Sequence, residues 1–176
     1  AIFQSTMDTE VIIHLIALSQ KANLQDKIID AISQIEGAFS LVIIHKDGII
    51  ALRDPYGVRP LSLAKIGDAY VVASETCAFD IIGAKLIREI AHGEMILISK
   101  KGVESLKPFE EKPSKFCIFE YVYFARPDSL IEGKNVYEMR KNIGIELARE
   151  IKIDADVIVP IPDSGVPAAI GYAMES

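Results

Sequence analysis

The chain has 176 residues, of which half are hydrophobic, with a formal net charge of −6 and a sequence pI near 5.1. This composition is that of a globular protein with enough apolar side chains to form a core. The acidic balance, with Lys and Arg scattered along the chain, argues against a nucleic-acid-binding surface, which needs a clustered basic stripe.

The sequence also argues against a membrane or secreted protein. Its apolar runs, such as residues 11–18 with His14 among them, fall short of the roughly 20 residues that span a bilayer. Residues 1–4 carry no basic leader region and no Met, so we expect an internal piece of a longer, cytoplasmic protein. Two cysteines, Cys77 and Cys117, are too few for a secreted disulfide scaffold of this length.

The first two predicted elements are helices. Ile12, Leu15 and Ile16 have helical spacing, and Asp8 stands near the start as a candidate N-cap. A second stripe of four isoleucines between residues 28 and 35 has the same period. We expect this second helix to stop at Gly37.

Strand patterns follow the helices. Residues 38–45 and 49–53 are apolar and rich in β-branched side chains, and the Lys-Asp-Gly sequence between them predicts a hairpin turn. Further strands are expected at residues 61–66, 69–73, 89–90, 95–99 and 103–106, with a short helix at 76–82. The first two-thirds of the chain therefore predicts an α+β fold with a mostly antiparallel sheet.

Residues 107–115 are polar, contain two prolines and form the best candidate for a linker between domains. After them, residues 116–124 have the composition of a strand. A domain boundary near residue 115 follows from this change of pattern.

The last third predicts a long helix and the opening of an α/β unit. Asn135 is the expected N-cap, with Glu138 at the capping-box position. The expected apolar face of that helix consists of Val136, Met139, Ile143, Leu147 and Ile151. An apolar strand at 156–160, a loop and a small-residue helix from Val166 then predict a strand–loop–helix unit.

Three residues are candidates for ligand binding, and each also has a purely structural interpretation. Ser164 lies in a Pro-Asp-Ser-Gly turn before the last helix, where it either contacts phosphate or Mg²⁺ or caps the helix. Cys117 is either a small buried side chain or a metal-bound thiolate. Asp8 is either a helix cap or a carboxylate for the ammonium group of a ligand. The charged turn at residues 53–61 is likewise a structural turn or part of a binding site.

Taken together, several segments resemble the amidophosphoribosyltransferase family. They are residues 8–11 (Asp-Thr-Glu-Val), 53–61 (Arg-Asp-Pro-Tyr-Gly-Val-Arg-Pro-Leu), 73–75 (Ala-Ser-Glu), 119–129 (Phe-Glu-Tyr-Val-Tyr-Phe-Ala-Arg-Pro-Asp-Ser), 136–142 and 160–164. The Arg-Asp-Pro and Ala-Ser-Glu segments also resemble other glutamine amidotransferases, such as asparagine synthetase. The run at 119–129 is far more specific to this family.

The resemblance implies an enzyme that makes 5-phosphoribosylamine from phosphoribosyl pyrophosphate and glutamine, the first committed step of purine synthesis. It implies that residues 1–115 are a type 2 glutamine amidotransferase domain with the αββα N-terminal-nucleophile fold, lacking its N-terminal part. Residues 116–176 would be the start of an α/β type I phosphoribosyltransferase domain.

The resemblance also implies roles for the three candidates. Asp8 matches the residue that binds the amino group of glutamine, and Ser164 matches a residue at the Mg²⁺ site. Cys117 matches a ligand of a [4Fe-4S] cluster in the cluster-bearing branch of the family.

Two motifs that the resemblance implies for the whole enzyme, the N-terminal catalytic cysteine and the Asp-Asp signature, are absent from this sequence. We therefore assign no catalytic residue. We expect this chain alone to be inactive. We also expect association into a homo-oligomer, since apolar surface would be exposed. A non-catalytic module that binds a phosphorylated ligand or a partner subunit is the alternative function.

Overall fold

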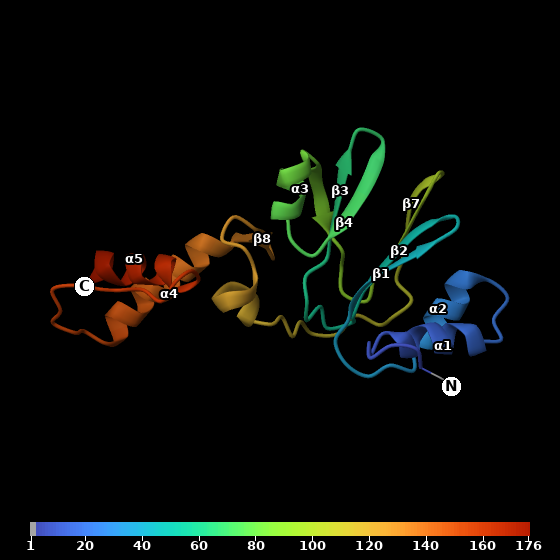
Figure 1. Cartoon of the computed structure of the whole chain (residues 1–176), viewed down its shortest axis with the longest axis horizontal. Coiled ribbons are helices and arrows are strands. Elements are labelled where there is room, and N and C mark those ends of the chain that lie inside the picture. The colour runs from blue at the N-terminus through green and yellow to red at the C-terminus, as the bar shows by residue number, and fades with distance from the viewer. Residues whose placement is uncertain (1–2) are drawn as a thin grey trace.

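Two short helices open the part of the chain that the computed structural model describes, residues 3–176. Helix α1 covers Glu10–Leu18 and α2 covers Leu24–Ile32, and the two lie together at one end of the elongated molecule (Figure 1). Asn23 caps α2 by accepting a hydrogen bond from the Asp26 N–H. Ala1 and Ile2, part of the stretch in which we found no leader sequence, lie outside the described residues.

Helix α2 ends five residues before the predicted stop. Its last residue is Ile32 and Ser33 is its C-cap, so the expected end at Gly37 is wrong. Ile35 nevertheless packs on the same core as Ile28 and Ile32. The helical spacing of apolar residues therefore continues beyond the last turn of α2, which explains why the predicted end of the helix was too late.

Within residues 3–176, seven strands form two antiparallel sheets. The first sheet has the order β1-β2-β6-β7 and the second has the order β4-β3-β5. The strands are β1 Ser40–His45, β2 Gly48–Arg53, β3 Ser62–Ile66, β4 Ala69–Ala73, β5 Lys85–Glu89, β6 Met95–Ser99 and β7 Gly102–Leu106, and helix α3 covers Cys77–Ile82. The predicted strands at 69–73 and 95–99 are confirmed with their bounds.

The predicted hairpin is confirmed as β1–β2, in which His45 pairs with Gly48. Gly48 has a φ of +153°, and a Cβ atom there would lie 1.9 Å from the Ile98 carbonyl oxygen of β6. Glycine is thus required where the turn meets the neighbouring strand. The prediction of a strand at 89–90 missed most of β5, because the exposed side chains of this strand show no alternation of apolar and polar residues.

Alternating side chains on the strands build a layered core. On β2, Ala51 faces the second sheet, whereas Ile50 and Leu52 face α1 and α2. On β3, Leu63 faces the first sheet and Ala64 packs with Phe79 of α3. The layers therefore run helix, sheet, sheet, helix, which confirms the predicted α+β character.

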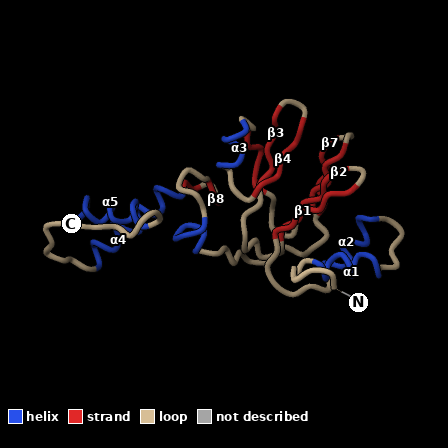
Figure 2. The backbone as a smooth tube through the Cα atoms, viewed as in Figure 1, coloured by secondary structure: helices blue, strands red, loops and turns tan. Residues whose placement is uncertain are grey.

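Beyond β7 the chain crosses to a second, mainly helical part, as the colouring by secondary structure shows (Figure 2). Residues 107–115 contain no helix or strand, as expected of a linker. The second part contains the π-helix η1 Glu120–Phe124, a two-stranded hairpin of β8 Leu130–Ile131 and β9 Lys134–Asn135, and helices α4 Val136–Glu150 and α5 Gly165–Glu175.

The expected strand at 116–124 is wrong, since residues 120–124 are helical. The Ala125 N–H donates to the Glu120 carbonyl at 3.1 Å, which is the π-helical spacing. Arg140 of α4 donates to the carbonyl oxygens of Tyr121 (2.5 Å) and Ala125 (2.8 Å). The aromatic and β-branched residues of this segment favoured a strand, but Arg140 satisfies carbonyl groups of a helical backbone here.

Helix α4 begins as predicted, because the Asn135 side chain accepts a hydrogen bond from the Glu138 N–H. Its predicted apolar face is wrong in its C-terminal half, where Ile143, Leu147 and Ile151 are about half exposed. The buried positions are Val136, Arg140, Gly144 and Ala148. Gly144 and Gly171 of α5 each lie against the backbone of the facing helix, so small residues make this interface.

The expected strand at 156–160 is also absent, and those residues are irregular. Among residues 3–176 no strand pairs with them, so their backbone groups have no ladder to join. In the same described range, no helix has the length and apolar character needed to cross a bilayer.

Candidate functional site

Asp8 lies just before α1 with an exposed side chain. Thr9 occupies the N-cap position without a side-chain cap bond, so the predicted cap is displaced by one residue. The Asp8 Oδ1 atom accepts a hydrogen bond from the Thr9 N–H at 2.8 Å. The structure thus presents a carboxylate at the start of a helix, pointing to solvent.

Glu10 organises the segment around Asp8. Its carboxylate accepts hydrogen bonds from the Ser5 hydroxyl (2.6 Å) and from the N–H groups of Gln4 (2.7 Å) and Ser5 (2.8 Å). These bonds, that from the Ser5 hydroxyl first, lower the pKa of Glu10 to about 2. The residues before α1 are therefore held against its first turn.

Ser164 is the N-cap residue of α5, but its hydroxyl makes no capping hydrogen bond. The Gly165 N–H donates to the Ile161 carbonyl (3.2 Å) and the Val166 N–H to the Asp163 carbonyl (3.3 Å). Two of the backbone donors expected to face a phosphate are thus used inside the turn. The half-buried Ser164 hydroxyl is what this turn offers to a ligand.

Cys117 is half-buried beside the turn at residues 53–61. Its N–H donates to the Val58 carbonyl at 3.1 Å, and Arg59 Nη1 lies 4.0 Å from its Sγ. An iron–sulfur cluster is held by several Cys thiolates together. Residues 3–176 contain no group of three or more His, Cys, Asp or Glu side chains that could hold a metal, so they do not fit a cluster by themselves.

The structure does not bring the three candidates together. Asp8 precedes α1 and Ser164 precedes α5, and these helices lie at opposite ends of the molecule (Figure 1). Cys117 lies in the irregular stretch between the two parts. They belong to three separate places.

The first two charged residues of the turn at 53–61 are engaged in hydrogen bonds within the protein. Arg53 is buried and donates to the carbonyl oxygens of Arg59 (2.9 Å), Ile90 (2.9 Å) and Gly57 (3.1 Å). The Asp54 carboxylate accepts hydrogen bonds from the N–H groups of Tyr56 and Val58. For these two residues the structural interpretation is the correct one.

The sequence did not reveal a junction that joins the Ala-Ser-Glu segment to the specific run at 119–129. Glu75 Oε2 accepts hydrogen bonds from the Arg126 N–H (2.7 Å) and the Ser129 hydroxyl (2.8 Å). The Leu130 N–H donates to the Thr76 hydroxyl at 2.8 Å. Both segments carried the family resemblance, but a separation of about 50 residues hid their contact.

An ion pair between an exposed arginine and a buried glutamate lies beside this junction. Arg59 Nη1 lies 2.9 Å from Glu120 Oε1, and its guanidinium stacks over the Phe124 ring at 4.6 Å. Burial raises the pKa of Glu120, with Arg59 opposing and Glu75 adding to that shift. The junction therefore combines hydrogen bonds to the Glu75 carboxylate and the Thr76 hydroxyl with an ion pair.

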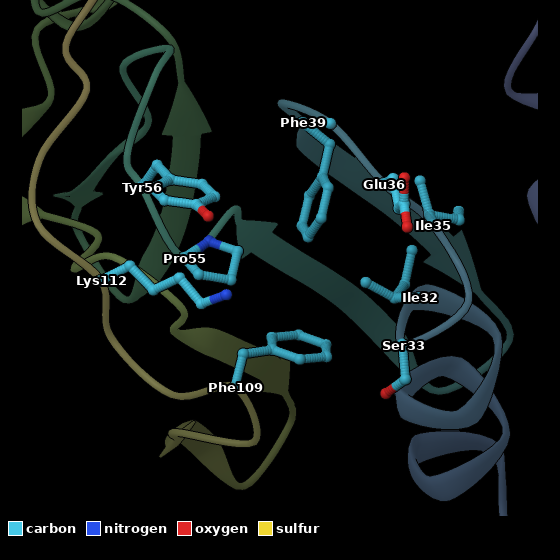
Figure 3. A pocket seen from close by; sticks show the side chains of 10 residues that line it. Ile32, Ser33, Ile35, Glu36, Phe39, Pro55, Tyr56, Phe109 and Lys112 are labelled. Atoms are coloured by element: carbon cyan, nitrogen blue, oxygen red, sulfur yellow. The ribbon is translucent and has the colours of Figure 1, made fainter.

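A pocket of about 410 Å³ opens where α2 approaches the turn at residues 53–61 (Figure 3). Phe39, Tyr56 and Phe109 point toward it, and Lys112 lies over the Tyr56 ring at 5.3 Å. None of Asp8, Cys117 and Ser164 lines it. The pocket is a separate feature from the predicted ligand-binding residues.

Comparisons with known proteins agree with this layout. The glutamine amidotransferase domain family matches residues 1–80. Amidophosphoribosyltransferase of Rhizobium etli is 52% identical over 181 residues, which cover 100% of this chain and 36% of that protein. The Bacillus subtilis enzyme of the same name is 47% identical over 98% of this chain and 36% of its own length, and a chloroplastic one from Glycine max is 45% identical over 100% and 31%.

A solved structure is equally similar. Glutamine phosphoribosylpyrophosphate amidotransferase from B. subtilis, complexed with ADP and GMP, superposes with a TM-score of 0.97 at 47% identity. The match covers 99% of this chain and 38% of that one. The present chain thus spans about a third of the length of its curated relatives.

The match at residues 1–80 identifies that stretch as glutamine amidotransferase domain sequence. The similarity continues through the junction to the last helix. The chain is homologous over its whole length to the amidophosphoribosyltransferases. The family predicted from the residues alone is confirmed.

Proposed function

We propose that this chain is part of a glutamine-dependent enzyme that makes 5-phosphoribosylamine from phosphoribosyl pyrophosphate and glutamine, at the start of purine synthesis. The observation that carries the proposal is the extent of the similarity. It runs unbroken from the amidotransferase part through α4 and α5, at 52% identity to one amidophosphoribosyltransferase. An asparagine-synthetase-like protein would share the first part alone.

The domain assignment belongs to the same proposal. Residues 1–115 form the type 2 amidotransferase domain with the αββα N-terminal-nucleophile fold, and residues 116–176 begin the type I phosphoribosyltransferase domain. The four layers of the first part support the first assignment. The irregular linker at 107–115 and the turn leading into α5 support the second.

We assign the ligand roles on the same basis. Asp8 binds the amino group of glutamine, for which its exposed carboxylate is suited. Ser164 contributes at the Mg²⁺ site, where Mg²⁺ characteristically binds one or two protein groups together with substrate phosphates. Cys117 is assigned to a cluster that further thiolates must complete, because the described residues contain no group of three or more potential metal ligands.

Location and assembly stay predictions. We expect a cytoplasmic homo-oligomer that binds neither nucleic acid nor membrane, although a plant relative is named chloroplastic. Exposed Ile44, Val159 and Ile161 support association, since buried apolar surface favours it. Sedimentation showing a stable monomer at high concentration would contradict this.

The decisive experiment is an assay of the full-length gene product. We expect pyrophosphate release that requires both glutamine and phosphoribosyl pyrophosphate. Asp8→Asn should raise the KM for glutamine and leave ammonia-dependent transfer unchanged, whereas Ser164→Ala should raise the requirement for Mg²⁺. Absence of pyrophosphate release from a folded full-length protein would favour the non-catalytic ligand-binding module.

A further inference from the structure

Glu132 has a backbone conformation that few residues other than glycine adopt. It forms the tip of the β8–β9 hairpin with Gly133, and their φ angles are +50° and +70°. Two positive φ angles in a two-residue hairpin loop define a type I′ turn, for which Asn-Gly is a preferred sequence. No other non-glycine residue in the described range has a positive φ. Glutamate stands here against local preference, which points to a compensating contact.

That contact is an ion pair with the sheet part. Glu132 Oε1 lies 3.1 Å from Arg53 Nη2, and Arg53 Nη1 lies 3.7 Å from Glu89 Oε2. The Glu132 N–H also donates to Glu89 Oε1 at 2.6 Å. Both the backbone and the side chain at the turn tip are therefore bound to residues of the first part.

The buried position of Arg53 favours a substantial contribution of this ion pair to holding the hairpin against the sheets. The Arg53 side chain is 2% exposed, and its other hydrogen bonds go to neutral carbonyl groups. Its charge is balanced by Glu132 and by Glu89, whose own pKa is raised by burial and by the Glu132 charge. The Glu132 side chain is 37% exposed, so loss of its carboxylate should cost more than breaking a surface pair and less than breaking a fully buried one.

The rest of the hairpin adds neutral contacts on the same side. Ser129 and Ile131 are fully buried, and Leu130 donates to Thr76. Helix α4 begins directly after β9, so the position of the hairpin determines where that helix lies.

We propose that Glu132 is a positioning residue whose carboxylate, bound to Arg53, holds the β8–β9 hairpin on the sheets and fixes the placement of α4. A functional consequence, which rests on the proposed function, is that the same contact sets how efficiently nitrogen released from glutamine is used for transfer. The residue acts through Arg53 and touches no reacting atom.

Two substitutions separate this role from that of a turn residue. Glu132→Asn suits a type I′ turn but does not reach Arg53, whereas Glu132→Gln keeps the length and the backbone strain but removes the charge. Glu138→Gln removes the same charge within the first turn of α4 and serves as the matched control. If Glu132 mattered only to the turn, Asn would be neutral or stabilising.

Amide hydrogen exchange, measured by NMR on this chain, tests the docking directly. Both Glu132 variants should speed exchange at Arg126 and Leu130, which donate across the junction, by on the order of tenfold. Ala125 and Val136 donate within the second part and should exchange at wild-type rates. Wild-type or slower exchange at Leu130 in Glu132→Asn would overturn the proposal.

The functional consequence is measured in the full-length protein as phosphoribosylamine formed per glutamate released. In Glu132→Gln this ratio should fall about fivefold, with ammonia-dependent transfer unchanged. An unchanged ratio together with faster junction exchange would overturn the coupling consequence. A wild-type protein without any transfer would refute the proposed function, while the exchange experiment would still decide the role of Glu132.

Discussion

The two parts of the molecule are stabilised by different kinds of packing. In the sheet part, hairpins are joined by the pairings of β2 with β6 and of β3 with β5, and alternating side chains fill cores on both faces of each sheet. In the helical part, α4 and α5 approach until Gly144 and Gly171 touch the opposite backbone. Large apolar side chains such as Val157 and Ile161 remain exposed there. The sheet part depends on burying large side chains, whereas the α4–α5 contact depends on having small ones.

The largest expected effect comes from truncating the sheet core. Leu52→Ala should lower the free energy of unfolding by about 3 kcal/mol, because Leu52 is fully buried between the first sheet and α2. Ile44→Ala on β1, where the side chain is 80% exposed, should change it by less than about 0.5 kcal/mol. Urea denaturation followed by circular dichroism measures both. Equal losses would contradict the assigned core.

In the helical part, enlarging a side chain at the α4–α5 contact should lower the free energy of unfolding. A Cβ atom at Gly144 would lie 1.8 Å from the Ala168 carbonyl oxygen, so Gly144→Ala should cost about 2 kcal/mol. The same change at Gly165, which meets nothing within 4 Å, should be neutral or stabilise by roughly 0.5 kcal/mol. Thermal unfolding compares the two variants, and equal melting temperatures would count against close α4–α5 packing.

A smaller effect is expected where α4 begins. Asn135→Ala removes the acceptor for the Glu138 N–H and should cost about 1 kcal/mol. Asn135→Asp retains an acceptor and should recover most of that loss. Faster exchange of the Glu138 amide in the alanine variant alone would locate the effect at the helix end. If alanine and aspartate behave alike, the cap contributes nothing.

The smallest effect concerns pH and the start of α1. Because the folded-state pKa of Glu10 is lowered from 4.5 to about 2, its contribution is present above pH 4.5 and is lost as the pH falls toward 2. An NMR titration of the Glu10 side-chain carboxyl should therefore have a midpoint near 2. Ser5→Ala removes the first of its donors and should raise that midpoint, whereas Ser99→Ala should not. A wild-type midpoint near 4.5 would show that the N-terminal segment is not held to the helix.

Local signals in the sequence found many of the elements. The Lys-Asp-Gly turn predicted the β1–β2 hairpin, and Asn135 with Glu138 predicted the start of α4. These signals work because a turn or a cap is a contact between residues a few positions apart. The residues that carried the family resemblance were sufficient to identify the relatives that the comparisons confirm.

Other predictions failed where a distant residue decided the local structure. Residues 116–124 were expected to form a strand, but Arg140 binds the carbonyl groups of a π-helix there. The apolar stripe through Ile143 and Leu147 was expected to face the core, but the contact with α5 is made by small residues. Composition does not indicate which face of a helix another backbone approaches.

The same distinction between local and long-range signals applies to the functional residues. Asp8, Cys117 and Ser164 could be named from their motifs, and their roles remain proposals. The junction that joins Glu75 to Arg126 and Arg53 to Glu132 could not be found, because its partners are 51 and 79 residues apart.

The turns, the helix start at Asn135, the alternation that fills the sheets and the family could all be predicted from the residues alone. Each of these depends on side-chain chemistry or on spacing along the chain. Contacts between distant residues explain why residues 120–124 are helical, why glycines form the α4–α5 contact and why a glutamate occupies a strained turn. These outcomes are set by groups brought together by folding, since a buried arginine or a close backbone selects a conformation that local preference disfavours.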